Sequence, residues 1–356
     1  MVRSGVNVFL ATVLLASPSL GAGLDGEEPA VVYNQEKGLW DRGSAKRFEL
    51  TVDLVIGAND DEENEIFFGR LYDVALDAEN NIYVLDNSCS QVFKFDNSAV
   101  LVQRTGRAGE GPGEIRDPMA IAVDAASHLY VAGDGKICIF DARGDYIKEF
   151  RLELAGRYIR ELAAISDRVY VSCFDVFEQK VIHVYSVSSG RKVASFCDSY
   201  AVGQDVDVRI EQTFGGGTFS VGAGGLIYFS QNTPYLIRTF SADGVLVLEI
   251  HRQASFFHDP EVELSANGSM KFGPLTSSTS IVVLNASRFI NSVKQTGVPG
   301  DTSTILDLFD GNGHLLTSKR VEQDIIPKCL DSAGRLYATD MGGDSPTVVR
   351  YRVLTD

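Results

Sequence analysis

A short phrase recurs along this chain: an apolar residue, a tyrosine, and an apolar or small residue, a few positions after a turn. Its copies are Ile82-Tyr83-Val84, Leu129-Tyr130-Val131, Val169-Tyr170-Val171, Ile227-Tyr228-Phe229 and Leu336-Tyr337-Ala338. The steps between copies are 47, 40, 58 and 109 residues, and a degenerate copy at 288–290 divides the last step into 61 and 48. Six units of about 40 to 60 residues, each made of short strands, predict an all-β, six-bladed propeller.

The first unit shows most clearly what one blade contains. Turn-forming Asp and Asn residues separate four strand-like stretches, at residues 72–76, 82–85, 91–95 and 100–104. Four short strands joined by such turns indicate an antiparallel meander. The following units span residues 120–151, 159–195 and 217–250, and an insertion from His251 to Pro274 precedes the fifth.

The sixth unit ends one strand early. It offers strands at 325–330, 336–339 and 348–353, and the sequence then stops. An open edge on the last blade would invite association with other chains. The alternating segment 48–56, FELTVDLVI, lies before the first unit. We therefore expect this N-terminal strand to pair into the C-terminal blade and close the ring.

The first 22 residues are typical of a signal peptide. Arg3 is followed by an apolar run and by small residues at 19–23, where a signal peptidase cuts. The run is too short for a stable membrane anchor, and an ordinary buried helix is the alternative. We expect a signal peptide at 1–22, an N-terminal extension at 23–47 and the propeller at 48–356, in a protein exported to the periplasm or beyond.

Charge and cysteine content exclude several function classes. The net charge of −16 argues against nucleic acid and anionic membrane surfaces, which both attract basic patches. No further stretch is apolar enough to span a membrane. The five cysteines are odd in number and show no CxxC spacing, so a zinc or redox motif is not expected and at least one thiol lacks an intrachain partner. We expect no catalytic cysteine.

Two units resemble the NHL repeat. They read VALDAENNIYVLDNSCSQVFKFD and IAVDAASHLYVAGDGKICIFDARGDY, and the linker TGRAGEGPGE at 105–114 resembles the link between such repeats. The motif Gly38-Leu39-Trp40 before the closing strand is similar to the opening of exported bacterial six-bladed β-propeller proteins of the NHL superfamily. This resemblance covers roughly residues 31 to 356. It implies the fold and a general binding role, with no inherited reaction.

No motif in the chain indicates catalysis or a cofactor. The glycine-rich 109–114 segment lacks the Lys and Ser/Thr of a phosphate loop, and the acidic run 60–65 lacks the scaffold of a calcium loop. The five histidines, including His251 and His258, fall at unlike positions of different units. Related propeller enzymes hold a metal on the ring axis, but the first-strand positions here are mostly Ala, Val, Ile and Leu. Catalytic residues stay unassigned, and neither a metal nor another cofactor is expected.

A possible binding rim surrounds the mouth of the predicted ring. Arginine and aromatic residues precede several first strands, and polar or aromatic residues fill loops between second and third strands; together they are Arg70, Tyr72, Asn87, Arg116, Asp134, Tyr158, Arg160, Phe174 and Asn232. Such a rim suits a polar or anionic ligand or a protein loop. In the alternative interpretation, these arginines pair with neighbouring acids and the Asp residues cap their own turns.

The sequence therefore predicts a non-catalytic, exported binding or scaffold module. It would present one propeller face to a protein or polar ligand, bind no nucleic acid, lack a membrane span and act as a monomer. A metal-dependent lyase or hydrolase with its site on the propeller axis remains the alternative.

Overall fold

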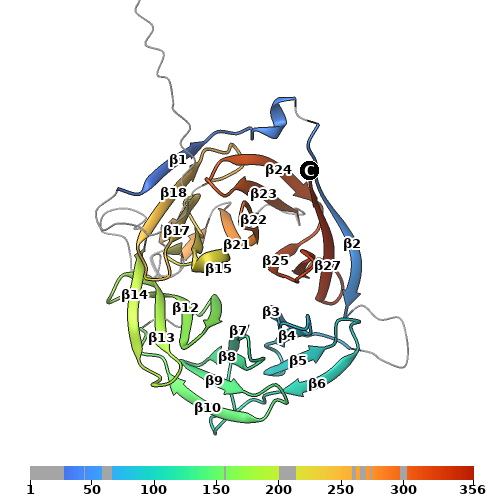
Figure 1. Cartoon of the computed structure of the whole chain (residues 1–356), viewed down its shortest axis with the longest axis vertical. Helices are drawn as coiled ribbons and strands as arrows, with labels where there is room; N and C mark the ends of the chain where they lie inside the picture. The colour runs from blue at the N-terminus through green and yellow to red at the C-terminus, as the bar shows by residue number, and fades with distance from the viewer. Residues whose placement is uncertain are drawn as a thin grey trace, which may run out of the picture.

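The computed structural model describes residues 28–43, 45–57, 66–155, 158–199, 214–258, 262–264, 270–272, 275–296 and 303–356. The predicted signal peptide, the acidic run 60–65 and the loop at 297–300 lie outside these residues. Six sheets are arranged around a common centre, like the blades of a propeller (Figure 1). A small hairpin of β19 (Val262–Leu264) and β20 (Met270–Phe272) lies within the insertion that precedes the fifth blade.

Each blade is an antiparallel meander, as predicted. The first blade contains β3 (Leu71–Leu76), β4 (Ile82–Asp86), β5 (Gln91–Phe95) and β6 (Leu101–Thr105). The second blade contains β7 (Pro118–Val123), β8 (Leu129–Gly133), β9 (Lys136–Phe140) and β10 (Tyr146–Arg151). The third blade contains β11 (Glu161–Ile165), β12 (Arg168–Asp175), β13 (Lys180–Ser186) and β14 (Lys192–Asp198). The fourth blade contains β15 (Gly217–Val221), β16 (Ile227–Gln231), β17 (Leu236–Phe240) and β18 (Leu246–Arg252). The fifth blade contains β21 (Leu275–Asn285), β22 (Arg288–Thr296), β23 (Thr304–Asp310) and β24 (Leu315–Val321). The sixth blade contains β25 (Ile325–Leu330), β26 (Leu336–Asp340), β27 (Thr347–Thr355) and β2 (Phe48–Ile56).

In the first two blades, the recurring tyrosine is tied to the turn that precedes it. The tyrosine is nearly inaccessible there, and its hydroxyl donates to an aspartate, Tyr83 to Asp77 at 3.2 Å and Tyr130 to Asp124 at 3.0 Å. The same aspartates accept backbone N–H groups of their own turns. Because a buried hydroxyl needs a hydrogen-bond partner, this contact couples tyrosine and turn in these two blades. The Tyr170 hydroxyl donates instead to the Ala242 carbonyl, and the Tyr337 hydroxyl accepts from Arg350.

The ring closes through the N-terminal strand, as the sequence predicts. The innermost strands contact one another in the order β3, β7, β11, β15, β21 and β25, and β25 in turn contacts β3. β2 pairs antiparallel with β27, from Phe48 opposite Thr355 to Ile56 opposite Val348. The two ends of the propeller therefore share one sheet, and the last blade has no missing strand.

The segment before β2 is also part of the ring. β1 (Ala30–Asn34) pairs in parallel with β18 and adds a fifth strand to the fourth blade. The Asn34 side chain then bonds the fifth blade, donating to the Gly313 carbonyl at 2.9 Å and accepting from the Leu315 N–H at 2.7 Å. A short 3-10 helix, η1 (Trp40–Arg42), leads toward β2. We call residues 28–43 and 45–57 the N-terminal belt, because they join three consecutive blades.

The belt lies so close to the fifth blade that only glycine fits at one position. A Cβ atom on Gly38 would stand 2.2 Å from the carbonyl oxygen of Leu316. We expect Gly38→Ala to destabilise the protein by about 1–3 kcal/mol, because the belt must move away from β24. Urea denaturation followed by circular dichroism measures this loss. Gly343→Ala is the control, since its nearest atom would be 3.6 Å away; equal stability of the two variants would contradict the close approach.

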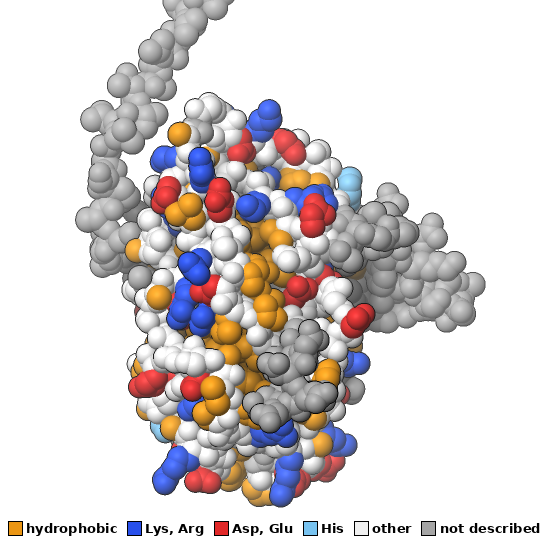
Figure 2. All heavy atoms as spheres, turned by 90° about the vertical axis from the view of Figure 1, so that its right-hand side faces the viewer, with side chains coloured by type: hydrophobic (Ala, Val, Ile, Leu, Met, Phe, Trp, Pro, Cys, Tyr) orange, Lys and Arg blue, Asp and Glu red, His pale blue; other side chains and the backbone are white. Residues whose placement is uncertain are grey.

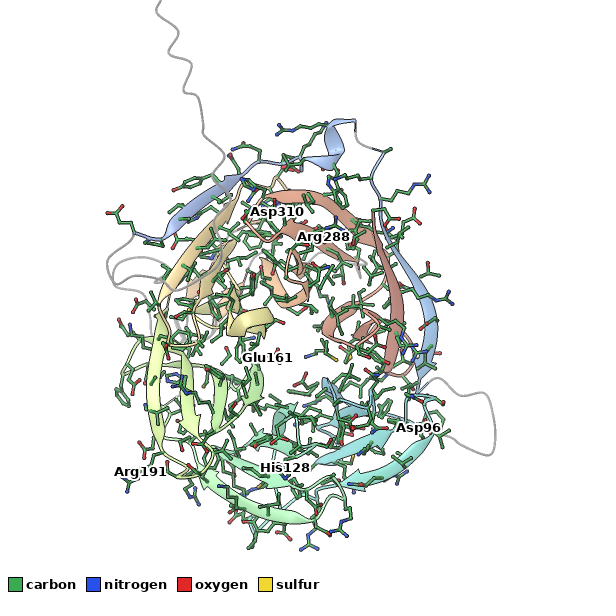
Figure 3. The ribbon with its side chains drawn as sticks, in the orientation of Figure 1. Asp96, His128, Glu161, Arg191, Arg288 and Asp310 are labelled. Carbon is green, nitrogen blue, oxygen red and sulfur yellow. The ribbon has the colours of Figure 1, made fainter. Side chains whose placement is uncertain are left out.

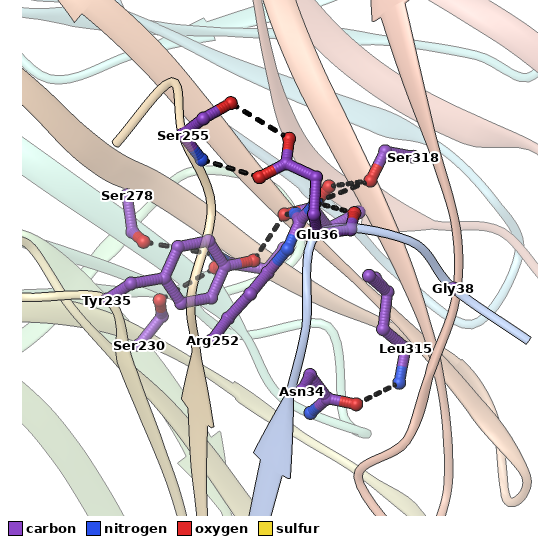
Figure 4. A network of polar contacts seen from close by, with 12 residues as sticks. Asn34, Glu36, Gly38, Ser230, Tyr235, Arg252, Ser255, Ser278, Leu315 and Ser318 are labelled. Atoms are coloured by element: carbon purple, nitrogen blue, oxygen red, sulfur yellow. Dashed lines mark hydrogen bonds and ion pairs between the residues drawn. The ribbon is translucent and has the colours of Figure 1, made fainter. Parts of the chain in front are cut away.

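A buried polar network joins the fourth and fifth blades beneath the belt (Figure 4). Arg252 forms an ion pair with Asp307, and their side chains are only 1% and 0% exposed. The Tyr235 hydroxyl donates to Asp307 at 2.5 Å, and Ser318 donates to the other carboxylate oxygen at 2.7 Å. Both charges are thus removed from water but kept within hydrogen bonds, as buried ions require.

The outer wall of the ring exposes hydrophobic side chains. Val52 and Val55 of β2, Leu354 of β27 and Val102 of β6 are each 41–56% exposed. Figure 2 views the side that carries β2 and shows a hydrophobic band flanked by charged side chains. Charges beside an exposed sheet edge discourage edge-to-edge association.

The five cysteines, all of which lie in the described ranges, form no disulfide with one another. Burial raises the pKa of Cys138, Cys173 and Cys197 to about 12. These thiols therefore stay protonated at neutral pH and are poor nucleophiles. Among the residues that the structure places, no helix is long and apolar enough to cross a membrane.

Candidate functional site

The two faces of the ring differ in their connections. Successive strands of a blade alternate in direction, so the links between blades and the loops between second and third strands lie on one face, which we call the linker face. The turns between first and second strands lie on the opposite face, which we call the turn face. Turns such as 77–81 are short, whereas the linkers include residues 106–117 and the insertion after β18. Longer loops on a rigid scaffold are the usual place for binding.

Large aromatic side chains are exposed on the linker face. Phe67 and Tyr72 border the first blade and are 61% and 36% exposed, while Tyr158 and Phe177 border the third and are 66% and 87% exposed. Arg70 is exposed beside Tyr72. Exposed aromatic and arginine side chains are enriched where proteins bind partners. Of the predicted rim, Arg70, Tyr72 and Tyr158 are therefore accessible.

Two other members of the predicted rim pair with each other. Arg116 forms ion pairs with Glu110 and with Asp134, the latter at 3.7 Å between Nε and Oδ2. All three side chains are more than half exposed, and exposed ion pairs contribute little to stability. This is the arrangement that the alternative interpretation of the rim predicts for its arginines.

The remaining predicted rim residues are largely enclosed by the protein. Asn87 is buried and donates through Nδ2 to the Pro118 carbonyl at 3.0 Å, which joins the first blade to the second. Asn232 is buried, and its carbonyl accepts the Ser278 N–H of the fifth blade. Phe174 packs in the core between the third and fourth blades. Arg160 is half-buried, and burial lowers its pKa.

The structure reveals charged residues at the centre of the ring that sequence reasoning missed. Glu161 lies near the centre of the ring in Figure 3. Asp73 of β3 pairs with Leu85 of β4, and Glu161 of β11 pairs with Ser172 of β12. Leu85 and Ser172 each lie two residues after the repeated tyrosine of their blade. Lys328 lies at a register shift in β25, between Pro327 and Cys329. We call Asp73, Glu161 and Lys328 the axial cluster. Counting back from the repeated tyrosine along the paired strands would have revealed the first two.

Charge and burial give the axial cluster unusual electrostatics. The Lys328 ammonium lies 3.4 Å from Oδ1 of Asp73. Burial, with the negative charge of Asp73, raises the pKa of Glu161 well above its ordinary value, and Lys328 offsets only part of this rise. Burial lowers the pKa of Lys328, but the charges of Asp73 and Glu161 outweigh it and raise that pKa. Perturbed ionisable groups of this kind mark candidate functional sites.

The raised pKa of Glu161 predicts how stability depends on pH. Above about pH 4.5, the ordinary pKa of this carboxyl, the unfolded chain loses its proton while the folded protein keeps it. Stability therefore falls as the pH rises toward the folded pKa, by at most about 1.4 kcal/mol per pH unit. We therefore expect the free energy of unfolding of Glu161→Gln, minus that of the wild type, to be larger at pH 8 than at pH 5. Urea denaturation at both pH values tests this, and a constant difference between the proteins would contradict it.

A pocket of about 320 Å³ lies at the linker-face end of the fourth blade. Pro234, Tyr235, Leu236 and Phe257 supply an apolar lining, and His251 and Gln253 supply polar groups. The His251 ring stacks on the Tyr33 ring, with 4.9 Å between the two ring centroids. Nε2 of His251 lies 2.6 Å from Oε1 of Glu249. Within the described ranges, no three His, Cys, Asp or Glu side chains are grouped so that they could hold a metal ion.

These features define the class of protein: a six-bladed β-propeller with a charged axis and one loop-rich face. Residues 62–212 match the model of a protein family described as a 6-bladed beta-propeller, DUF5128. No curated protein matches the chain.

Several solved structures share this fold. A member of the DUF4221 family from Bacteroides vulgatus ATCC 8482 has a TM-score of 0.61 at 7% identity, over 87% of this chain and 99% of its own. A protein of Bacteroides fragilis NCTC 9343 described as exported has a TM-score of 0.60 at 10% identity, over 91% of this chain and 99% of its own. A streptogramin B lyase has a TM-score of 0.50 at 10% identity, over 86% of this chain and 98% of its own. At these identities, the likeness concerns the fold alone.

Proposed function

We propose that this protein is an exported, non-catalytic binding module of the NHL-repeat type, which presents its linker face to a protein partner or polar ligand. The similar fold of a Bacteroides protein described as exported supports export. The signal-peptide pattern at 1–22 supports it independently.

One observation carries the proposal: the exposed aromatic side chains of the linker face belong to the first and third blades, whose innermost strands carry the charged residues Asp73 and Glu161. Tyr158 and Phe177 are more than 60% exposed at the third blade. The innermost strand of the same blade begins with Glu161, beside the ring centre. Aromatic anchors around a small number of charged groups are what a specific binding surface requires.

The test compares the two faces of one protein. The wild type, a Tyr158→Ser/Phe177→Ser variant and a turn-face control, Ala126→Ser, are cross-linked in the native host and purified under identical conditions. We expect a molecule that is enriched by the wild type and the control but is reduced at least about tenfold with the linker-face variant. Equal recovery by all three proteins, with circular dichroism showing that all are folded, would refute the proposal.

The alternative function, a metal-dependent lyase or hydrolase, requires a set of ligands on the axis. The innermost strands supply two carboxylates there, Asp73 and Glu161, and Asp73 already accepts two backbone N–H groups. Metal analysis of the purified protein separates the two functions. An enzyme of this kind would retain near-stoichiometric metal and lose thermal stability in EDTA, whereas a binding module would do neither.

A further inference from the structure

The innermost strands carry an unequal number of opposite charges. β3 contributes Asp73, β11 contributes Glu161 and β25 contributes Lys328. The sequences of the other three innermost strands, β7, β15 and β21, contain no ionisable side chain. Fully ionised, the centre of the ring would therefore hold two carboxylates and one ammonium group, an excess of one negative charge.

The single ammonium group is committed to one of the two carboxylates. Lys328 lies 3.4 Å from Asp73. Asp73 also accepts the N–H of Val74 and the N–H of Ile121 in the second blade, both at 2.9 Å. Asp73 is therefore fully engaged and holds Lys328 in place. No cation forms an ion pair with Glu161 in the parts of the chain that the structure describes.

Glu161 is the axial residue that a partner can reach. It is the first residue of β11, so it stands at the end of the innermost strand where the chain enters from the linker face. As a residue, Glu161 is partly exposed, whereas Asp73 is 2% exposed. The aromatic residues Tyr158 and Phe177 border the same blade. Glu161 is therefore the more accessible of the two axial carboxylates for a group that docks on the linker face.

We infer that Glu161 receives a positively charged group of the binding partner, a primary ammonium or guanidinium such as a lysine or arginine side chain. This rests on the proposed binding function of the linker face and names the chemistry that the face selects. Burial and the negative charge of Asp73 raise the pKa of the Glu161 carboxyl, so before binding it keeps a proton more readily than an ordinary glutamate. On binding, that proton leaves to solvent, and the incoming cation pairs with the carboxylate. The net charge of −16 further favours approach of a basic partner.

The experiment uses n-butylammonium as the probe and butan-1-ol as its uncharged analogue. Binding to the mature protein is measured by saturation-transfer NMR at pH 7.5 and pH 5. We expect saturable binding of n-butylammonium alone, weaker at pH 5, where a proton competes for Glu161. The expected loss of affinity in Glu161→Gln is at least about tenfold.

Two further variants keep the result interpretable. Glu322→Gln changes an exposed glutamate between β24 and β25 and is expected to bind the probe like the wild type. Glu161→Asp keeps the carboxylate and is expected to retain measurable binding, which separates loss of charge from loss of fold. Equal binding to Glu161→Gln, equal binding of butan-1-ol, stronger binding at pH 5 or no saturable binding would each overturn the inference. If the probe fails while the Tyr158→Ser/Phe177→Ser variant still loses its partner, the linker face is correct and the axial cation is wrong.

Discussion

Arg252→Met is expected to destabilise the protein by about 3–5 kcal/mol, because it leaves the Asp307 carboxylate buried without its cation. Asp307 is completely inaccessible, and its remaining partners are the hydroxyls of Tyr235 and Ser318. Two neutral donors do not replace a guanidinium in compensating a buried charge. Urea denaturation at pH 7 measures the loss.

Two companion variants identify the cause. Arg252→Met/Asp307→Asn removes the unpaired charge and should recover part of the lost stability. Arg168→Met breaks an ion pair with Asp243 whose side chains are 48% and 81% exposed, so its cost should stay below about 1 kcal/mol. If Arg252→Met cost no more than Arg168→Met, the buried ion pair would not hold the fourth and fifth blades together.

Trp40→Ala is expected to destabilise the protein by about 3–5 kcal/mol, because it empties a core site between the belt and the ring. Trp40 is 8% exposed and belongs to one core cluster with Phe48, Leu316 and Tyr351. Arg288 and Lys46 lie over its ring, at 5.3 and 5.4 Å from the centroid. The expected loss therefore combines packing with two cation–π contacts.

The measurement needs circular dichroism rather than fluorescence, since Trp40 is the only tryptophan of the chain. Leu39→Ala is the matched control: Leu39 is the preceding residue, and it is 51% exposed. The free energy of unfolding of Leu39→Ala should lie within about 0.5 kcal/mol of the wild-type value. Similar losses for the two variants would mean that the belt is not anchored through the indole.

The repeat was enough to predict the ring, its blades and its closure. The repeated tyrosine marks the second strand of each unit, and in the first two blades its buried hydroxyl bonds the aspartate of the preceding turn, as Tyr83 and Asp77 show. The closing strand was predictable because the last unit lacked a strand that the alternating segment 48–56 could supply. Both inferences depend on local pattern and on the rule that sheet edges are covered.

The parallel pairing of β1 was not predictable in the same way. Its partner β18 lies more than 200 residues away, and neither strand is incomplete without the other. The sequence showed residues 23–47 only as an extension. A parallel strand added to an existing edge leaves no gap in any repeat, so no count of units could reveal it.

The axial cluster was missed for a geometric reason. A register shift between Pro327 and Cys329 changes which side chains of β25 face inward, so simple alternation misplaces Lys328. Asp73 and Glu161 stay in register with the repeated tyrosine and were missed because the tyrosine was not used to set the strand phase. Conversely, Phe174 and Asn232 occupy loops of the linker face in sequence but are buried in the structure, because neighbouring blades cover them. Strand phase and packing between blades are tertiary properties that spacing does not encode.

Site-specific photocross-linking in the native host tests the central claim most directly, namely that binding occurs on the linker face. A benzoylphenylalanine photocross-linker replaces Phe177 on the linker face, Ala126 in the turn before β8 on the turn face, or Val102 on the outer wall; all three residues are exposed. The account predicts a discrete adduct from position 177 and none from positions 126 and 102. Adducts from position 126 or 102 without one from position 177 would contradict it.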